Sequence, residues 1–213
     1  MKLQISFDIT NIEEALKIAH QVEPHCDQFE VGSLMLYAFG TEAIRAFKKE
    51  FPHKKLIADA KIIDRSAEII ELLSHAGADQ ITVMGSTNKN VLYTAVQAAQ
   101  QQNVRLMLDL IDAASPGQIA MTAQTIGINT IIAHKPHDEA ELSDFLDQWD
   151  MIRGNTKLPI FIAATITREN IAPILALKPD GIIIGQAITQ AKNPAQEAEY
   201  FYGLCNIKTN VAA

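Results

Sequence analysis

Eight short apolar runs recur along this chain at intervals of about 25 residues, and a charged or glycine-containing group follows nearly every one of them. Several of the runs are unbroken stretches of isoleucine, leucine, valine and alanine. Parallel strands that are covered by helices on both faces have this composition. The runs predict strands at residues 3–8, 28–32, 56–60, 79–84, 105–110, 129–133, 159–163 and 181–185.

Helical patterns fill the segments between the predicted strands. Asn11 and Glu14 have the spacing of a capping box, and apolar residues follow them at helical intervals. Ser115 and Asn193 each precede a proline, a residue that is favoured at the first position of a helix. Further helices are predicted at residues 41–50, 65–76, 88–102, 138–152 and 168–176.

An eightfold alternation of strands and helices defines an α/β protein that most simply closes into a single (β/α)8 TIM barrel. A doubly wound open sheet is the alternative, but no Gly-x-Gly-x-x-Gly pattern follows the first strand. Because the chain has 213 residues and no linker-like segment, we expect residues 1–213 to form one barrel domain. The polar segment 206–213 is expected to be a poorly ordered tail.

Charge and cysteine content narrow the class of protein. A net charge of −7 argues against a nucleic-acid-binding protein, which would need a basic surface. The first residues read as a strand rather than a signal peptide, and no apolar stretch is long enough to span a membrane. Cys26 and Cys205 lack metal-ligand spacing, so we interpret them as unpaired thiols. We therefore expect a cytoplasmic protein without nucleic-acid or membrane partners.

Chemically active side chains gather at the predicted carboxyl ends of the strands, where barrel enzymes have their active sites. They are Asp8, Glu30, Asp59, Lys61, Asp109 and His134. Alternate residues of a strand point to the same side, so Asp59 and Lys61 should project together. A carboxylate and an ammonium in one small space are costly unless they pair or serve a purpose. The rim therefore predicts an enzyme active site.

Glu30 and Asp59 could together bind Mg²⁺, which takes one or two carboxylates and completes its octahedron with water and substrate oxygens. A sugar with adjacent carbonyl and hydroxyl oxygens would suit such a centre. The metal and Lys61 could then stabilise the negative charge that develops on an enediolate. Glu30 taken alone could equally be a structural ion-pair partner.

The other polar residues of the rim allow more than one assignment. His134 ends the sixth strand and could move protons, whereas His137 reads as a solvated loop residue. Asp8 could orient substrate hydroxyls or hold Lys61, and Asp109 could do the same or be structural. Asp64 lies past the third strand, so it could reach across the rim or across a subunit boundary.

The last two loops are candidates for binding a phosphate, which in barrels often lies between the loops after strands seven and eight. Gly185 and Gln186 follow the eighth strand, and Thr165 follows the seventh. A glycine at a strand end is also an ordinary turn residue. The side chains of Thr165, Gln186 and Thr189 could offer neutral hydrogen-bond donors to the phosphate of a sugar.

The Asp-x-Lys-x-x-Asp pattern of Asp59, Lys61 and Asp64 resembles the signature of the orotidine monophosphate decarboxylase suprafamily. The segment Glu30-Val31-Gly32 resembles the metal-binding branch, which includes 3-hexulose-6-phosphate synthase and 3-keto-L-gulonate-6-phosphate decarboxylase. Orotidine monophosphate decarboxylases have lysine at the position of Glu30, so that activity is disfavoured. The resemblance extends over essentially the whole chain, from the first strand to Thr189.

The resemblance implies a role for each matching residue. Glu30 and Asp59 would bind Mg²⁺, Lys61 would stabilise the enediolate, and His134 would transfer protons. Asp8 would contact the substrate. Asp64 would be supplied to the site of a neighbouring subunit, which implies a homodimer.

Both reactions of this branch use the enediolate of a pentulose phosphate. The synthase forms it from ribulose 5-phosphate and adds formaldehyde, whereas the decarboxylase forms it by losing carbon dioxide. Asp109-Leu110-Ile111 is similar to the synthase, and Ala58 to Ile62 with Asp64 is similar to the decarboxylase. We favour the synthase, an aldehyde-lyase, over the decarboxylase, a carboxy-lyase.

The chain departs from both enzymes in its phosphate loops. The seventh loop usually contains Gly-Gly, where this chain has Ala164-Thr165, and the eighth often has Gly-Arg or Gly-Gly, where it has Gly185-Gln186. Loss of glycine can block a close approach of phosphate to the backbone, and loss of arginine removes a charged donor. A non-catalytic barrel that binds sugar phosphates is therefore a further hypothesis.

Overall fold

The structure is a computed structural model that describes residues 1–136 and 143–206, and for residues 143–147 it describes the backbone only. Its strands are β1 (Lys2–Phe7), β2 (Gln28–Val31), β3 (Lys55–Ile62), β4 (Gln80–Met84), β5 (Arg105–Asp109), β6 (Thr130–His134), β7 (Ile160–Ala163) and β8 (Gly181–Ile184). Its helices are α1 (Ile12–Val22), α2 (Ser33–Phe39), α3 (Thr41–Glu50), α4 (Ser66–Ala76), α5 (Lys89–Gln102), α6 (Pro116–Ile126), α7 (Ser143–Arg153), α8 (Ile171–Ala176), α9 (Gln186–Thr189) and α10 (Pro194–Asn206), with a short 3₁₀ helix at Glu23–His25.

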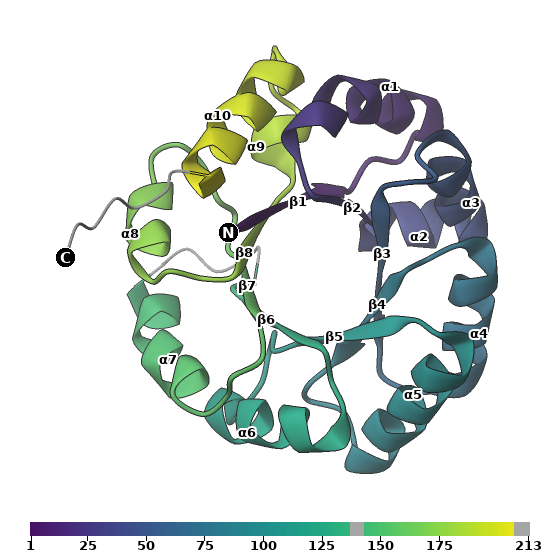
Figure 1. The fold of residues 1–213 in the computed structure, drawn as a ribbon, viewed down its shortest axis with the longest axis vertical. Helices are drawn as coiled ribbons and strands as arrows, with labels where there is room; N and C mark the ends of the chain where they lie inside the picture. The colour runs from purple at the N-terminus through teal and green to yellow at the C-terminus, as the bar shows by residue number, and fades with distance from the viewer. Residues whose placement is uncertain (137–142, 207–213) are drawn as a thin grey trace.

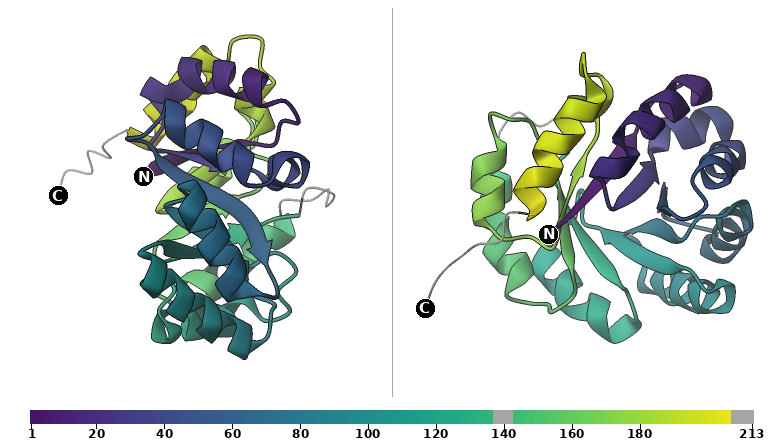
Figure 2. Two further views of the ribbon diagram at one scale, coloured as in Figure 1. Left: turned by 90° about the vertical axis from the view of Figure 1, so that its right-hand side faces the viewer. Right: turned by 45° about the horizontal axis from the view of Figure 1, so that its top comes forward.

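The eight strands pair in chain order and close into a barrel, because β1 pairs in parallel with both β2 and β8. Figure 1 shows the strands as an inner ring and the helices as an outer ring, with α10 lying between α8 and α1. Figure 2 shows the same ring from the side and at an angle. The predicted (β/α)8 TIM barrel is confirmed, and the alternative of an open sheet is wrong.

Each predicted strand is present, and the bounds differ by one or two residues. Helices α2 and α9 were not predicted, because each is short and directly follows a strand end. The helix predicted at 168–176 begins only at Ile171, since the preceding residues form a loop. Asn206 ends α10 rather than starting a tail, and residues 207–213 lie outside the described residues. The same holds for residues 138–142 of the predicted helix 138–152.

Two packed regions hold the barrel together. The larger lies between strands and helices and buries most of the apolar side chains of the alternating runs. The smaller cluster is formed by Ile57, Met107, Ile132, Phe161 and Ile183. Side-chain alternation along each strand separates the two sets, as expected for a barrel whose interior is packed.

Cys26 and Cys205 are free, as predicted, and both are buried. Burial raises the pKa of each thiol to about 12. Within the described residues, none of the helices has both the length and the apolar character needed to cross a membrane.

Candidate active site

An irregularity in β3 brings Asp59 and Lys61 to the mouth of the barrel. The register between β3 and β4 shifts between Ala58 and Ile62, and Lys61 has a left-handed backbone with φ of 44°. Thr82 of β4 stabilises this stretch, because its Oγ1 accepts a hydrogen bond from the Lys61 backbone N–H at 2.8 Å and donates to Asp59 Oδ1 at 2.9 Å. A bulge that re-aims side chains in this way is common beside active sites.

Lys61 lies between two buried carboxylates. Its Nζ donates to Asp59 Oδ2 and lies 3.6 Å from Asp109 Oδ2. Burial disfavours the charged ammonium, but the charges of Asp59 and Asp109 outweigh it, so the pKa of Lys61 is raised. Lys61 is therefore held as a cation.

His134 is linked to the same carboxylate. Its Nδ1 lies 2.8 Å from Asp109 Oδ2, and the other oxygen of Asp109 accepts a hydrogen bond from the Ile111 backbone N–H at 2.9 Å. Burial alone would lower the pKa of His134, but the hydrogen bond and charge of Asp109 raise it. Burial alone would raise the pKa of Asp109, but His134 and Lys61 lower it. Asp109 thus connects the lysine to the histidine.

Glu30 is buried at the end of β2 and is held from β1. Ser6, its register partner on β1, donates to Oε1 at 2.6 Å, and the side-chain amide of Gln4 donates to Oε2. Burial raises the pKa of Glu30 to about 7, and the charge of Asp59 adds to this effect. The sequence-based alternative of a structural ion pair is not what holds Glu30 here, since its carboxylate accepts hydrogen bonds from a hydroxyl and an amide.

Asp8 lies against the start of α2. Its Oδ1 accepts a hydrogen bond from the Leu34 backbone N–H at 3.0 Å. A Cβ atom built on Gly32 would come within 2.2 Å of that same oxygen, so a larger residue here would displace the Asp8 carboxylate from this position. Burial raises the pKa of Asp8. Asp8 was considered either to orient substrate hydroxyls or to hold Lys61. Its carboxylate contacts α2 and lines the cavity wall, where it is accessible to a substrate hydroxyl.

These groups line a cavity of about 380 Å³ at the carboxyl ends of the strands. Its polar lining residues are Ser6, Asp8, Glu30, Ser33, Asp59, Lys61, His134, Lys135, Thr165, Thr167, Gln186 and Thr189. Gly185 and the apolar side chains of Ile111, Ala163, Ala164, Ile166, Ile183 and Ala187 complete the wall. The cavity joins the acid–lysine group to the two loops predicted to bind an anion.

Two predicted site residues lie elsewhere. Asp109 is fully buried beneath Lys61 and His134 and is not part of the cavity wall. Asp64 is exposed beyond β3 and does not line the cavity either, so it does not complete the site of its own chain. His137 lies outside the described residues.

Several residues of the site were missed by the sequence analysis. Ser6 and Gln4 precede Asp8 at two-residue spacing, which places them on one side of β1. Thr82 is a polar residue inside an apolar strand, which is also a readable signal. Lys135 and Thr167 gave no such signal, because they lie in loops whose course depends on the closed barrel.

Glu30 and Asp59 supply the kind of oxygen donors that a magnesium ion would need. Both carboxylates line one cavity, and each is close enough to the other for the charge of Asp59 to raise the pKa of Glu30. Mg²⁺ commonly binds through one or two carboxylates. Within the described part of the chain, no group of three or more His, Cys, Asp or Glu side chains is arranged to hold a metal, so a site here would rest on this pair.

A closed parallel barrel with a buried lysine–carboxylate–histidine network at the carboxyl ends of its strands defines an enzyme-type (β/α)8 barrel. The chain belongs to the family described as orotidine 5'-phosphate decarboxylase / HUMPS, which it matches over residues 1–201.

The relatives of this chain include proteins named 3-hexulose-6-phosphate synthase. The protein of that name from Bacillus subtilis is 32% identical over 200 residues, which cover 93% of this chain and 95% of the relative. The solved structure of that enzyme from Salmonella typhimurium is 30% identical, covers 96% of this chain and 98% of its own, and has a TM-score of 0.88. A 3-keto-L-gulonate-6-phosphate decarboxylase from Vibrio cholerae has a TM-score of 0.80 at 24% identity over 94% of this chain and 96% of its own, which shows the fold alone.

Proposed function

We propose that this protein is an aldehyde-lyase of the 3-hexulose-6-phosphate synthase type, which joins formaldehyde to ribulose 5-phosphate in a Mg²⁺-dependent reaction. The observation that carries the proposal is the network in which Asp59, Lys61 and His134 line one cavity and Asp109 lies beneath them. The relatives named as synthases support the same reaction.

Lys61 would act through its charge. Because its pKa is raised, the side chain stays an ammonium at neutral pH and is a poor nucleophile for a Schiff base. An ammonium in this position stabilises the oxyanion of an enediolate. Bound Mg²⁺, held by Glu30 and Asp59, would add Lewis-acid stabilisation of the same charge.

His134 would move the proton. Its Nδ1 is bonded to Asp109, so Nε2 is the nitrogen that serves the substrate. The neutral imidazole takes a proton from C1 of ribulose 5-phosphate, and this step converts the sugar phosphate into its enediolate. C1 then forms the new bond to the formaldehyde carbon, and the imidazolium returns its proton to the aldehyde oxygen. Asp109 stabilises the imidazolium between these two steps, which makes it a positioning residue rather than a substrate contact.

The substrate's phosphate would bind at the opposite wall of the cavity. Thr165, Gly185 and Gln186 lie there, and they offer backbone and neutral side-chain donors in place of the glycines and arginine of related loops. Asp8 would orient the sugar hydroxyls.

We also propose a homodimer in which Asp64 enters the partner's site. Asp64 follows Ile63, whose side chain is 65% exposed, and α2, which packs against β3, exposes Leu34 and Tyr37 at 55% and 86%. Large exposed apolar side chains of this kind favour a protein interface. The two buried, unpaired thiols support a cytoplasmic location.

The test is an assay with the protein, Mg²⁺, ribulose 5-phosphate and formaldehyde. We expect consumption of formaldehyde that stops when the metal is chelated, and a loss on the order of 10²–10³-fold in kcat for Lys61→Ala. Mg²⁺ should also raise the melting temperature of the wild type but not of Glu30→Gln. No consumption by folded protein would overturn the synthase proposal.

The second candidate is the decarboxylase, which the segment Ala58 to Ile62 with Asp64 favours. Release of carbon dioxide from 3-keto-L-gulonate 6-phosphate tests it. Tight binding of either sugar phosphate with neither turnover would instead support the non-catalytic barrel.

A further inference from the structure

The loop between β7 and α8, residues 164–170, carries part of the cavity wall. Thr165, Ile166 and Thr167 all line the cavity. Thr165 has a left-handed backbone with φ of 48°. This conformation is unfavourable for a β-branched residue, because Cβ comes too close to the following carbonyl oxygen. Contacts elsewhere must therefore hold the loop in place.

Asn170 provides the first of these contacts. Its side-chain oxygen accepts a hydrogen bond from the Thr167 backbone N–H at 2.8 Å, and its amide donates to the Thr165 carbonyl at 3.1 Å. The two hydrogen bonds of Asn170 thus close the loop on itself around Thr165. They do not connect the loop to the rest of the barrel.

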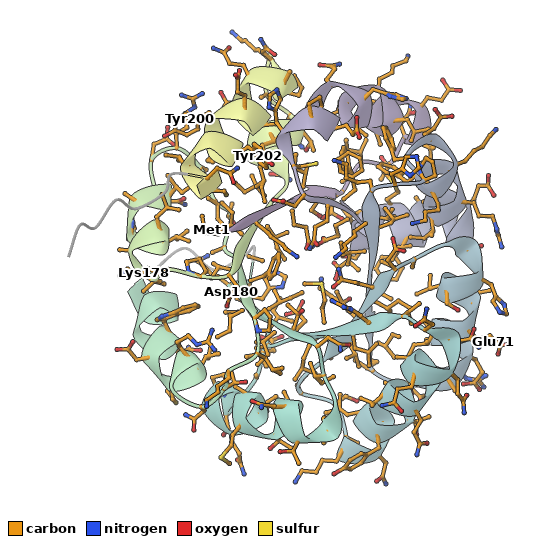
Figure 3. All side chains as sticks on the ribbon, viewed as in Figure 1. Met1, Glu71, Lys178, Asp180, Tyr200 and Tyr202 are labelled. Atoms are coloured by element: carbon orange, nitrogen blue, oxygen red, sulfur yellow. The ribbon has the colours of Figure 1, made fainter. Side chains whose placement is uncertain are left out.

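Ala164 and Ile166 of the loop are buried in the main core, and Arg168 adds a polar connection from the loop to α10. Its Nε and one terminal nitrogen donate to the two oxygens of Glu197 on α10, both at 2.9 Å, and its guanidinium lies 3.9 Å from the centre of the Tyr200 ring. Figure 3 labels Tyr200 on α10, the helix beside α8 in the outer ring. A bidentate pair with a stacked ring fixes the guanidinium in direction as well as in distance.

We propose that Arg168 is a positioning residue: anchored to Glu197 and Tyr200, it holds Thr165 in its left-handed conformation and so presents the 164–167 loop to the anionic end of the substrate. This inference rests on the proposed function for the identity of that substrate. Arg168 lies outside the cavity lining and does not touch the reacting atoms. The strained backbone of Thr165 is then the link between a contact on the surface and affinity in the cavity.

The experiment is a double-mutant cycle with Arg168→Ala and Thr165→Asn. Asparagine tolerates a left-handed backbone better than threonine does. If Arg168 acts by holding Thr165, Arg168→Ala should raise KM for ribulose 5-phosphate about fivefold, and kcat should change by less than about twofold. In the Thr165→Asn background, the same substitution should raise KM by less than about twofold. Arg168→Lys should restore only part of the affinity, because lysine cannot pair bidentately.

Arg45→Ala is the matched control. Arg45 is an exposed arginine on α3 that pairs with Glu42 at 4.0 Å, so its removal changes the net charge equally without touching the loop. An unchanged KM in Arg168→Ala, or an equal rise in both backgrounds, would overturn the proposal.

Hydrogen exchange tests the anchor without substrate. Arg168→Ala should speed exchange of the Thr167 backbone N–H about fivefold, and less in the Thr165→Asn background. Unchanged exchange would also overturn the proposal. If the wild type bound no ribulose 5-phosphate while its loop exchange responded as expected, the proposed function would fail and the positioning role would stand.

Discussion

Asp109 pairs with both Lys61 and His134, and its two carboxylate oxygens have different partners. One oxygen faces both Lys61 and His134, and the other holds the backbone at Ile111. A carboxylate that is buried and paired in this way has a fixed direction. The orientation of the imidazole is therefore set by a residue that the substrate never touches.

The His134–Asp109 pair predicts a pH-dependent stability. The pKa of His134 is raised above its unfolded value of 6.5, so its contribution is fully present below pH 6.5 and is lost as pH rises through the folded pKa. Its neighbours Lys61 and Asp59 act on the same group in opposite directions. We expect His134→Asn to lower the free energy of unfolding by more at pH 6 than at pH 9.

Urea unfolding at both pH values, at one protein concentration, measures this difference. Titration of Asp109 does not affect this comparison. Its pKa is lowered, so its contribution to stability is lost only in acid, below its unfolded value of 3.8. An equal loss of stability at pH 6 and pH 9 would contradict the predicted ion pair.

At the scale of the elements, the site depends on one irregular strand. A regular β3 would present Asp59 and Lys61 on one side but would lack the left-handed backbone at Lys61, which lies within the register shift. Thr82 on the neighbouring strand supports this stretch through the Lys61 backbone N–H and the Asp59 carboxylate. The irregularity therefore lies in β3, whereas the hydrogen bonds that stabilise it come from Thr82 of β4.

Thr82→Val should be destabilising, because it keeps the shape of the side chain and removes both hydrogen bonds. We expect the free energy of unfolding to fall by about 1–3 kcal/mol, the cost of leaving the Lys61 N–H unsatisfied, together with a loss of kcat. Thr94→Val is the control, since Thr94 is exposed and its hydroxyl donates to the Asn90 carbonyl of its own helix at 2.9 Å. Equal stability of the two variants would argue against this support.

The sequence predicted the elements better than the geometry between them. Period-two alternation placed Asp59 and Lys61 together, and the strand ends located Glu30, Asp8 and His134 on one rim. The left-handed backbone at Lys61 was not predictable, because it depends on pairing with β4. The role of Asp109 was left open for the same reason, since its burial depends on how β5 meets β6.

At the scale of the whole molecule, the site is missing one of its predicted members. Asp64 lies outside the cavity wall of its own chain, although it belongs to the same motif as Asp59 and Lys61. A second copy of the chain would bring an equivalent Asp64 to each site. That arrangement is a proposal that can be tested by mixing two inactive variants.

Lys61→Ala and Asp64→Asn should complement each other. In a mixed dimer, the site that keeps Lys61 receives the intact Asp64 of the other protomer, whereas the second site loses both. Random reassortment of equal amounts makes half of the dimers mixed, each with one active site, so about one quarter of the wild-type kcat per protomer should return. Each variant refolded alone is the control, and a mixture no more active than the separate variants would contradict shared sites.

The burial of Cys26 and Cys205 has a consequence for the proposed reaction, in which formaldehyde is a substrate. This small electrophile adds to thiolates far faster than to thiols. With each pKa at about 12, roughly one thiol in 10⁵ is ionised at pH 7. The chain thus keeps its most alkylation-prone atoms unreactive, and working concentrations of the aldehyde should leave both sulfurs unmodified.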